Sequence, residues 1–148
     1  MASNIDIVQQ SLDAFAKGDW KTYRSLCTDD IIYEEEATRR HVQGPDAFIE
    51  LLKEWKSAFS DLRAVVKQTV ASGDAVVVEV EWHGTHDGLL TGPFGDIAPT
   101  GRTAMTPAVL VLRFDNGRIR EDRHYFDLMT ALSQLGAVPT GAAQPSAR

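Results

Sequence analysis

The chain has 148 residues, of which 43% are hydrophobic and 24% charged, a composition typical of one soluble globular domain. Its net charge of −6 argues against nucleic acid or an anionic membrane surface as a partner. A single cysteine excludes an internal disulfide framework, and no apolar run reaches the roughly 20 residues of a membrane span. The N-terminus lacks the pattern of a signal peptide, so we expect a cytoplasmic protein.

The first half of the chain predicts mainly helices. Apolar residues recur at helical spacing over 4–17, and a second short helix is expected over 19–27. A strand is predicted at 30–36. The helix predicted at 44–59 has Pro45 in its first turn, a position that suits proline.

The second half predicts strands joined by tight turns. Two pairs are expected, with turns at Gly73–Asp74 and at the "DNG" of residues 115–117. The predicted elements are strands at 62–72, 74–86, 102–114 and 118–127, then a helix at 128–136 and a loose tail at 137–148. This order predicts an α+β fold in one domain, residues 1–136, with helices packed on one face of a curved antiparallel sheet around a cavity.

Side-chain alternation predicts which residues face that cavity. On strand 74–86, Trp82 and His86 share the apolar face and are expected to point inward. On strand 118–127 neither face is purely apolar: Tyr125 and Asp127 share one face, and Asp122 and His124 share the other. A bulge could exchange the faces midway, so the register of this strand stays open.

Residues 87–101 form a long connection without a clear element, and such loops are often functional. Leu89, Leu90, Phe94 and Ile97 make it apolar. These residues could close the cavity mouth, or they could cover a core edge or an oligomer interface.

Several motifs resemble the SnoaL-like polyketide cyclases. The pattern W-x-G-x-H at residues 82–86 is followed by "PTGR" at 99–102, "DNGRIRE" at 115–121, Asp127 and "LSQLG" at 132–136. The resemblance covers roughly residues 5–136. It implies the nuclear transport factor 2-like (NTF2-like) fold, a cone-shaped curved antiparallel sheet that is also described as a cystatin-like α+β barrel.

The resemblance also implies a cofactor-free intramolecular aldol closure on a hydrophobic polyketide-like or cyclic molecule. The family's general acid/base matches Asp127, and His86 matches a polar position near it. Each residue has a second interpretation. Asp127 also suits the N-cap of the last helix, and His86 can be a structural histidine at a strand end.

The remaining candidates are predicted to bind substrate in the cavity. For the aromatic ones the alternative is ordinary core packing, and for Arg102 it is a solvated strand start. These residues are Trp82, Tyr125, Tyr33, Trp55, Phe59, Phe94, Arg102 and Met105.

We expect no metal site, because His83 and His86 lie on opposite faces of their strand. The expected partner is a small hydrophobic ligand or substrate, and a homodimer is expected because the open sheet leaves a face exposed, with Glu79, Glu81 and His83 on it. The alternatives in function are a non-catalytic module for ligand binding or dimerisation, and a hydrolase or dehydratase on the same fold.

Overall fold

The computed structural model describes residues 2–138 of the chain. Helices come first and strands dominate the second half, as the sequence predicts. The elements are α1 (Asn4–Lys17), α2 (Trp20–Ser25), β1 (Cys27–Glu35), β2 (Arg40–Gln43), α3 (Pro45–Ala58), β3 (Arg63–Ser72), β4 (Ala75–Thr85), β5 (Thr103–Asp115), β6 (Arg118–Phe126) and α4 (Leu128–Gln134). No helix in the described part of the chain is long and apolar enough to cross a membrane.

Local signals explain where the helices begin and end. The Ser3 side chain accepts a hydrogen bond from the backbone of Asp6, whose carboxylate accepts one in return from the backbone of Ser3. Gly18 ends α1 in the left-handed conformation, with φ of 69°. Pro45 opens α3, where its missing N–H has no helical partner to lose.

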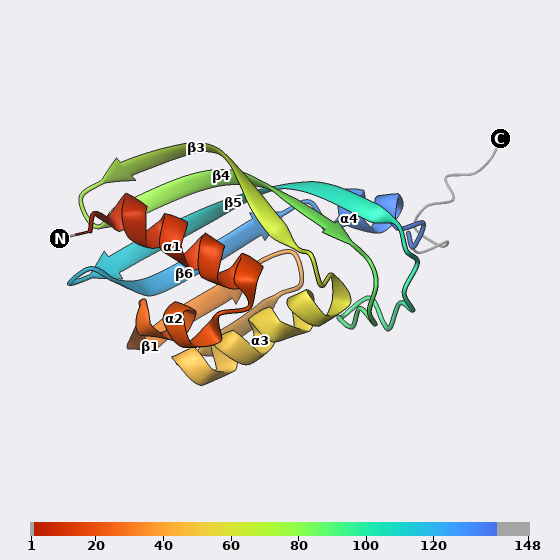
Figure 1. Cartoon of the computed structure of the whole chain (residues 1–148), viewed down its shortest axis with the longest axis horizontal. Helices are drawn as coiled ribbons and strands as arrows, with labels where there is room; N and C mark the ends of the chain where they lie inside the picture. Colours follow the sequence, from red (N-terminus) through yellow and green to blue (C-terminus); the bar gives the residue numbers. More distant parts are fainter. Residues whose placement is uncertain (1, 139–148) are drawn as a thin grey trace.

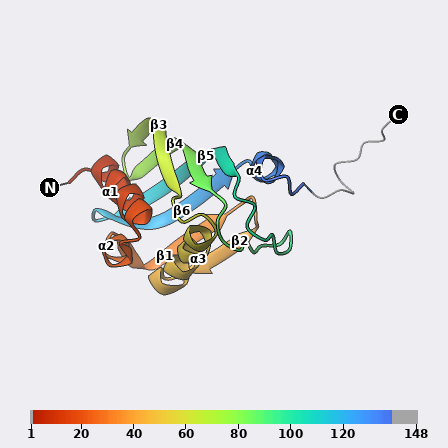
Figure 2. The same ribbon diagram turned by 45° about the vertical axis from the view of Figure 1, so that its right-hand side comes forward.

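The six strands form one sheet in the order β2-β1-β6-β5-β4-β3. The sheet curves, and α1, α2 and α3 cover one of its faces (Figure 1, Figure 2). The predicted α+β fold is therefore confirmed, but the sheet is not wholly antiparallel, since β1 runs parallel to β6. The sequence prediction also missed β2 and placed Cys27 in a helix, whereas Cys27 begins β1.

The core lies between the helices and the inner face of the sheet. Phe48 of α3 and Ile31 of β1 are completely buried, and the Phe48 ring stacks on the ring of Tyr33 at 4.5 Å between centroids. Val76 and Val78 on β4 are also fully buried, on the face predicted to be the inner one. Burial of this apolar surface is the main source of stability of such a fold.

A bulge in β6 settles which of its side chains face inward. Arg113 pairs with Glu121, but the next residue of β5, Phe114, pairs with Ile119, so Arg120 is the extra residue. Ile119 is buried before the bulge and Asp122 after it, although their spacing is odd. The bulge therefore exchanges the faces, and the even-numbered side chains Asp122 to Phe126 point inward.

The connection between β4 and β5 covers one edge of the core. Leu90 and Ile97 pair across it, and Leu90 is buried against Phe59 and Leu135. Phe94 and Ile97 pack on the same cluster, whereas Leu89 is exposed. Of the two interpretations left open, this packing favours the cover of a core edge. The tail predicted at 137–148 lies outside the described residues from residue 139 onward.

Candidate functional site

A mainly apolar cavity, rich in aromatic side chains, opens between the inner face of the sheet and the helices. Its volume is about 90 Å³, and since roughly 10–15 Å³ holds one water, it has room for several waters or one compact organic molecule. Ala131 of α4 contributes to the lining. The aromatic and imidazole side chains that line the cavity are Phe15, Tyr23, Tyr33, Trp55, Phe59, Trp82, His124 and Phe126.

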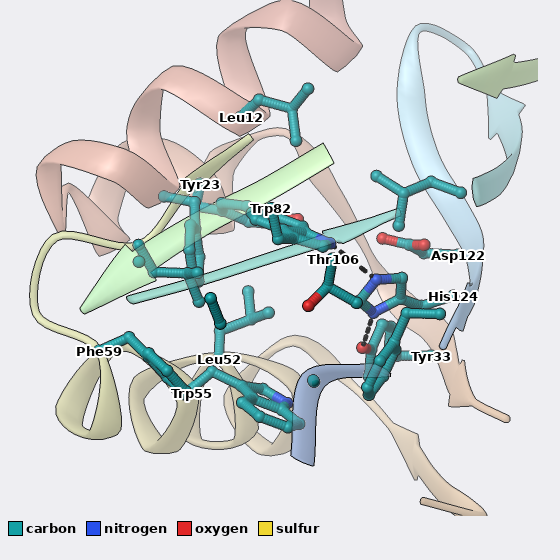
Figure 3. Close-up of a pocket in the computed structure, with 17 residues that line it drawn as sticks. Leu12, Tyr23, Tyr33, Leu52, Trp55, Phe59, Trp82, Thr106, Asp122 and His124 are labelled. Carbon is teal, nitrogen blue, oxygen red and sulfur yellow. Dashed lines mark hydrogen bonds between the residues drawn. The ribbon is translucent and has the colours of Figure 1, made fainter. Parts of the chain in front are cut away.

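Asp122 lines this cavity and is nearly inaccessible to solvent, with 3% of its surface exposed (Figure 3). Its Oδ1 atom has no hydrogen-bond partner within residues 2–138. Burial raises the pKa of Asp122 to about 7, and the negative charge of Glu35 acts in the same direction. Asp122 is therefore a carboxyl group that can release and take up a proton near neutral pH.

Glu35 on β1 is a second buried carboxylate, but it is fully hydrogen-bonded. Its Oε2 accepts hydrogen bonds from Tyr33 Oη at 2.7 Å and Trp55 Nε1 at 2.8 Å. Its Oε1 accepts from Thr38 Oγ1 at 2.5 Å and from the Arg40 guanidinium at 2.9 and 3.2 Å. Burial by itself raises the pKa of Glu35, but these hydrogen bonds and the charge of Arg40 outweigh burial and hold the pKa below its usual value.

Both ring nitrogens of His124 lie within hydrogen-bond distance of other side chains of the cavity wall. Nε2 accepts a hydrogen bond from Trp82 Nε1 at 3.0 Å, and Nδ1 lies 3.0 Å from Tyr33 Oη (Figure 3). Burial lowers the pKa of His124 to about 4, against an opposing effect of the charge of Glu35. The imidazole is therefore neutral at neutral pH, while Glu35 is an anion.

Four of the predicted substrate-binding residues meet at this cavity: Tyr33, Trp55, Phe59 and Trp82. Tyr33 also stacks on Phe48 in the core, so it belongs to both the core and the cavity wall. The indole N–H of Trp55 and that of Trp82 are both bonded within the wall, so each ring offers a ligand mainly its apolar surface.

The other four do not line the cavity. Tyr125 and Met105 are 42% and 49% exposed, because alternation along β6 and β5 sends them to the outer face of the sheet. Arg102 is exposed just before β5. Phe94 packs with Leu90 on the second core cluster.

His86 is buried, as expected, but it lies at the base of the β4–β5 connection and not in the cavity lining. Its Nδ1 atom accepts a hydrogen bond from the Thr100 backbone at 3.2 Å and lies 3.0 Å from Thr100 Oγ1. Its ring packs on Phe59 at 5.3 Å between centroids. These contacts fit the structural interpretation, in which His86 holds the connection against the end of β4.

Asp127 is exposed and caps α4, which corrects the expectation that it lies in the pocket. Its Oδ1 accepts a hydrogen bond from the Thr130 backbone at 3.0 Å, and its Oδ2 accepts one from the Thr130 hydroxyl at 2.6 Å. These hydrogen bonds hold the pKa of Asp127 below its usual value. Both properties are those of a helix cap and opposite to those of a buried base.

Sequence reasoning missed Asp122 and His124 as site residues. Both were placed together on one face of the strand, which was the available signal, but the bulge that turns this face inward could not be located. Thr106, which pairs with Trp82 across β4 and β5, also lines the cavity and was missed.

Within residues 2–138, no three His, Cys, Asp or Glu side chains are grouped as a metal ion requires.

A curved sheet with helices on one face and an apolar cavity between them is typical of the NTF2-like class of α+β proteins. A SnoaL-like polyketide cyclase family model matches residues 5–135. The chain belongs to this family. Among curated proteins, none matches the sequence.

Solved structures share this fold. A protein from Jannaschia sp. CCS1 described as a SnoaL-like polyketide cyclase is 24% identical, with a TM-score of 0.82 over 92% of this chain and 93% of that one. IdmH from Streptomyces antibioticus, described as a polyketide cyclase, is 26% identical, with a TM-score of 0.79 over 91% and 99%. An NTF2-like protein of unknown function from Burkholderia pseudomallei is 21% identical, with a TM-score of 0.74 over 91% and 98%.

Proposed function

We propose that the protein is a cofactor-free cyclase or isomerase that acts on a hydrophobic polyketide-like or cyclic molecule, with Asp122 as its general acid/base. The observation that carries this proposal is a buried carboxyl group whose Oδ1 has no hydrogen-bond partner within the described residues 2–138, in a mainly apolar cavity. A base in such surroundings is effective because its pKa lies near the working pH. Membership of the SnoaL-like family supports the same reaction class.

The reaction we propose is an intramolecular aldol closure. Asp122 removes a proton from a carbon next to a carbonyl group, and the enolate carbon attacks a second carbonyl carbon of the same molecule. The resulting alkoxide then takes the proton back from Asp122, so protons balance without a co-reactant. Thr106 supports this scheme, because its hydroxyl group lines the same cavity and can donate a hydrogen bond to the enolate oxygen.

The test is turnover of poly-β-keto esters, with cyclised products identified by mass spectrometry. Asp122→Asn is expected to lower the rate by on the order of 10²–10⁴-fold, the usual contribution of a positioned acid/base. Asp127→Asn is the matched control, since it changes an exposed carboxylate on the next element, and it is expected to keep the wild-type rate. Full turnover by Asp122→Asn would refute the proposed role.

The alternative is a binding domain without catalysis. It is favoured by one observation: the nitrogens of His124, Trp55 and Trp82 are all bonded within the wall, which leaves few polar groups free for a reaction. This alternative predicts that the wild-type protein binds an apolar fluorescent probe but converts none of the esters. A hydrolase or dehydratase on the same scaffold would instead be recognised by its product.

We also propose that the protein forms a homodimer in the cytoplasm through the outer face of the sheet. Val65, Val70 and Val77 are 40%, 60% and 39% exposed on β3 and β4, so this face offers apolar side chains that a second copy of the chain could cover. Sedimentation of the wild-type protein against Val70→Lys tests this interface. A dimer that Val70→Lys converts to monomer supports the proposal, and a wild-type monomer at micromolar concentration contradicts it.

A further inference from the structure

Glu35 does not line the cavity, yet it is among the most completely buried side chains of the described residues, with 0% of its surface exposed. An ionised carboxylate in the core is costly unless donors surround it, and Glu35 has donors on both oxygen atoms. One of them, the Tyr33 hydroxyl, also lies 3.0 Å from His124 in the cavity wall. A chain of hydrogen bonds therefore connects Glu35 to the cavity.

The direction of each hydrogen bond in this network follows from the two groups at its ends, the indole of Trp82 and the carboxylate of Glu35. An indole N–H can only donate, so the Trp82 N–H requires His124 Nε2 to accept. A carboxylate can only accept, so the single Tyr33 hydroxyl proton is donated to Glu35. The Tyr33 oxygen must then accept from His124, and the imidazole proton must lie on Nδ1.

We propose that Glu35 is a positioning residue: as an obligate acceptor it sets the direction of the Tyr33–His124 hydrogen bond and thereby places the imidazole proton of His124 on Nδ1. Both nitrogens of His124 are then bonded within the wall. His124 has neither a free donor nor a free acceptor with which to pair with Asp122, two residues away on the same face of β6. This last consequence, an Asp122 left free to act as acid/base, rests on the proposed function, whereas the proton position does not.

Because Trp82 favours the same proton position, the effect of Glu35 is isolated in a Trp82→Phe background. Long-range ¹H–¹⁵N correlation spectra of the full chain at pH 7 report which nitrogen of each of the four histidines carries the proton. His124→Gln identifies the His124 signals. In both wild type and Trp82→Phe, the proton is expected on Nδ1, because Tyr33 still requires a donor.

Adding Glu35→Gln to this background means that the direction of the hydrogen bonds made by Tyr33 is no longer fixed, since an amide can donate as well as accept. The ratio of Nδ1–H to Nε2–H forms of His124 is expected to fall by about tenfold or more, in line with the loss of a charge-assisted hydrogen bond. Adding Tyr33→Phe should cause the same fall. Thr38→Val is the matched control, because it removes a buried hydrogen bond to the other oxygen of Glu35 without touching the chain, and it should leave the ratio unchanged.

Three results would overturn the proposal. The wild-type proton could lie on Nε2, Glu35→Gln could leave the ratio unchanged in the Trp82→Phe background, or Thr38→Val could change it as much as Glu35→Gln does. None of these concerns turnover, so they are independent of the test of Asp122. Conversely, an Asp122→Asn protein with full activity would leave the proton position of His124 standing.

Discussion

Replacing Asp122 by asparagine tests the central feature of the site without any substrate. In the folded protein, burial raises the pKa of this carboxyl from 3.8 to about 7. Below about pH 4 the group is protonated in both the folded and the unfolded chain and contributes nothing. Between pH 4 and 7 the unfolded chain loses the proton while the folded protein keeps it, so the folded state loses stability as pH rises. The full penalty, at most about 4 kcal/mol, is present above pH 7.

Asparagine cannot ionise, so this penalty is absent from Asp122→Asn. The free energy of unfolding of the variant, relative to wild type, is therefore expected to rise by up to about 4 kcal/mol between pH 4 and pH 8. Urea denaturation at pH 4, 6 and 8 measures the difference, and comparing pH values cancels any change in packing. Asp127→Asn should show no such rise, because the pKa of Asp127 is lowered and its carboxylate is already ionised over most of this range. A constant difference between wild type and Asp122→Asn would refute the reasoning.

Three further substitutions test the assignments around the site. Asp127→Ala should destabilise the protein by about 1 kcal/mol through loss of the α4 cap, measured as a lower Tm, and should leave binding of an apolar probe unchanged; weakened probe binding with an unchanged Tm would contradict the cap assignment. Arg40→Met should cost about 3 kcal/mol in urea denaturation, because it leaves the fully buried Glu35 without its cation. Glu54→Gln, which removes only the half-exposed partner of Arg40, should cost less than about 1 kcal/mol; equal costs would contradict the distinction.

Sequence patterns predicted the elements whose formation depends on local signals. The boundaries of α1 follow from helical periodicity and Gly18, and the β5–β6 hairpin follows from its turn, where Asn116 and Gly117 have φ of 49° and 77°. The alternation on β4 likewise identified its buried face and the inward position of Trp82.

The missed features depend on contacts between distant parts of the chain. The first half of β2 and the end of β1 are charged, so hydropathy marks them as solvated. A glutamate can be buried there because Glu35 pairs with Arg40 and accepts hydrogen bonds from Tyr33, Thr38 and Trp55, none of which is adjacent to it in the chain. The bulge at Arg120 is another such feature, because it depends on how β6 pairs with β5. The expected position of Asp127 in the pocket has the same origin: in sequence a carboxylate that caps a helix looks like one that faces a cavity, and only the structure shows that Asp127 is exposed and caps α4.

The two buried carboxyl groups of the site differ in charge because they differ in donors. Glu35 accepts hydrogen bonds from four side chains and stays ionised, and its negative charge in turn makes ionisation of Asp122 less favourable. Glu35→Gln removes that charge, so the pKa of Asp122 is expected to fall below about 7 while remaining above 3.8, since burial is the larger cause.

A carboxyl-carbon NMR titration, assigned with Asp122→Asn, measures this pKa in wild type and in Glu35→Gln. Glu54→Gln serves as the control, because it removes a half-exposed carboxylate that pairs with Arg40, keeps every hydrogen bond of Glu35, and should leave the pKa of Asp122 nearly unchanged. If Glu35→Gln leaves that pKa unchanged as well, burial alone sets it, and the charge of Glu35 has no part in preparing Asp122 for acid/base chemistry. A fall confined to Glu35→Gln would mean that the carboxylate behind the cavity wall adjusts the one inside it.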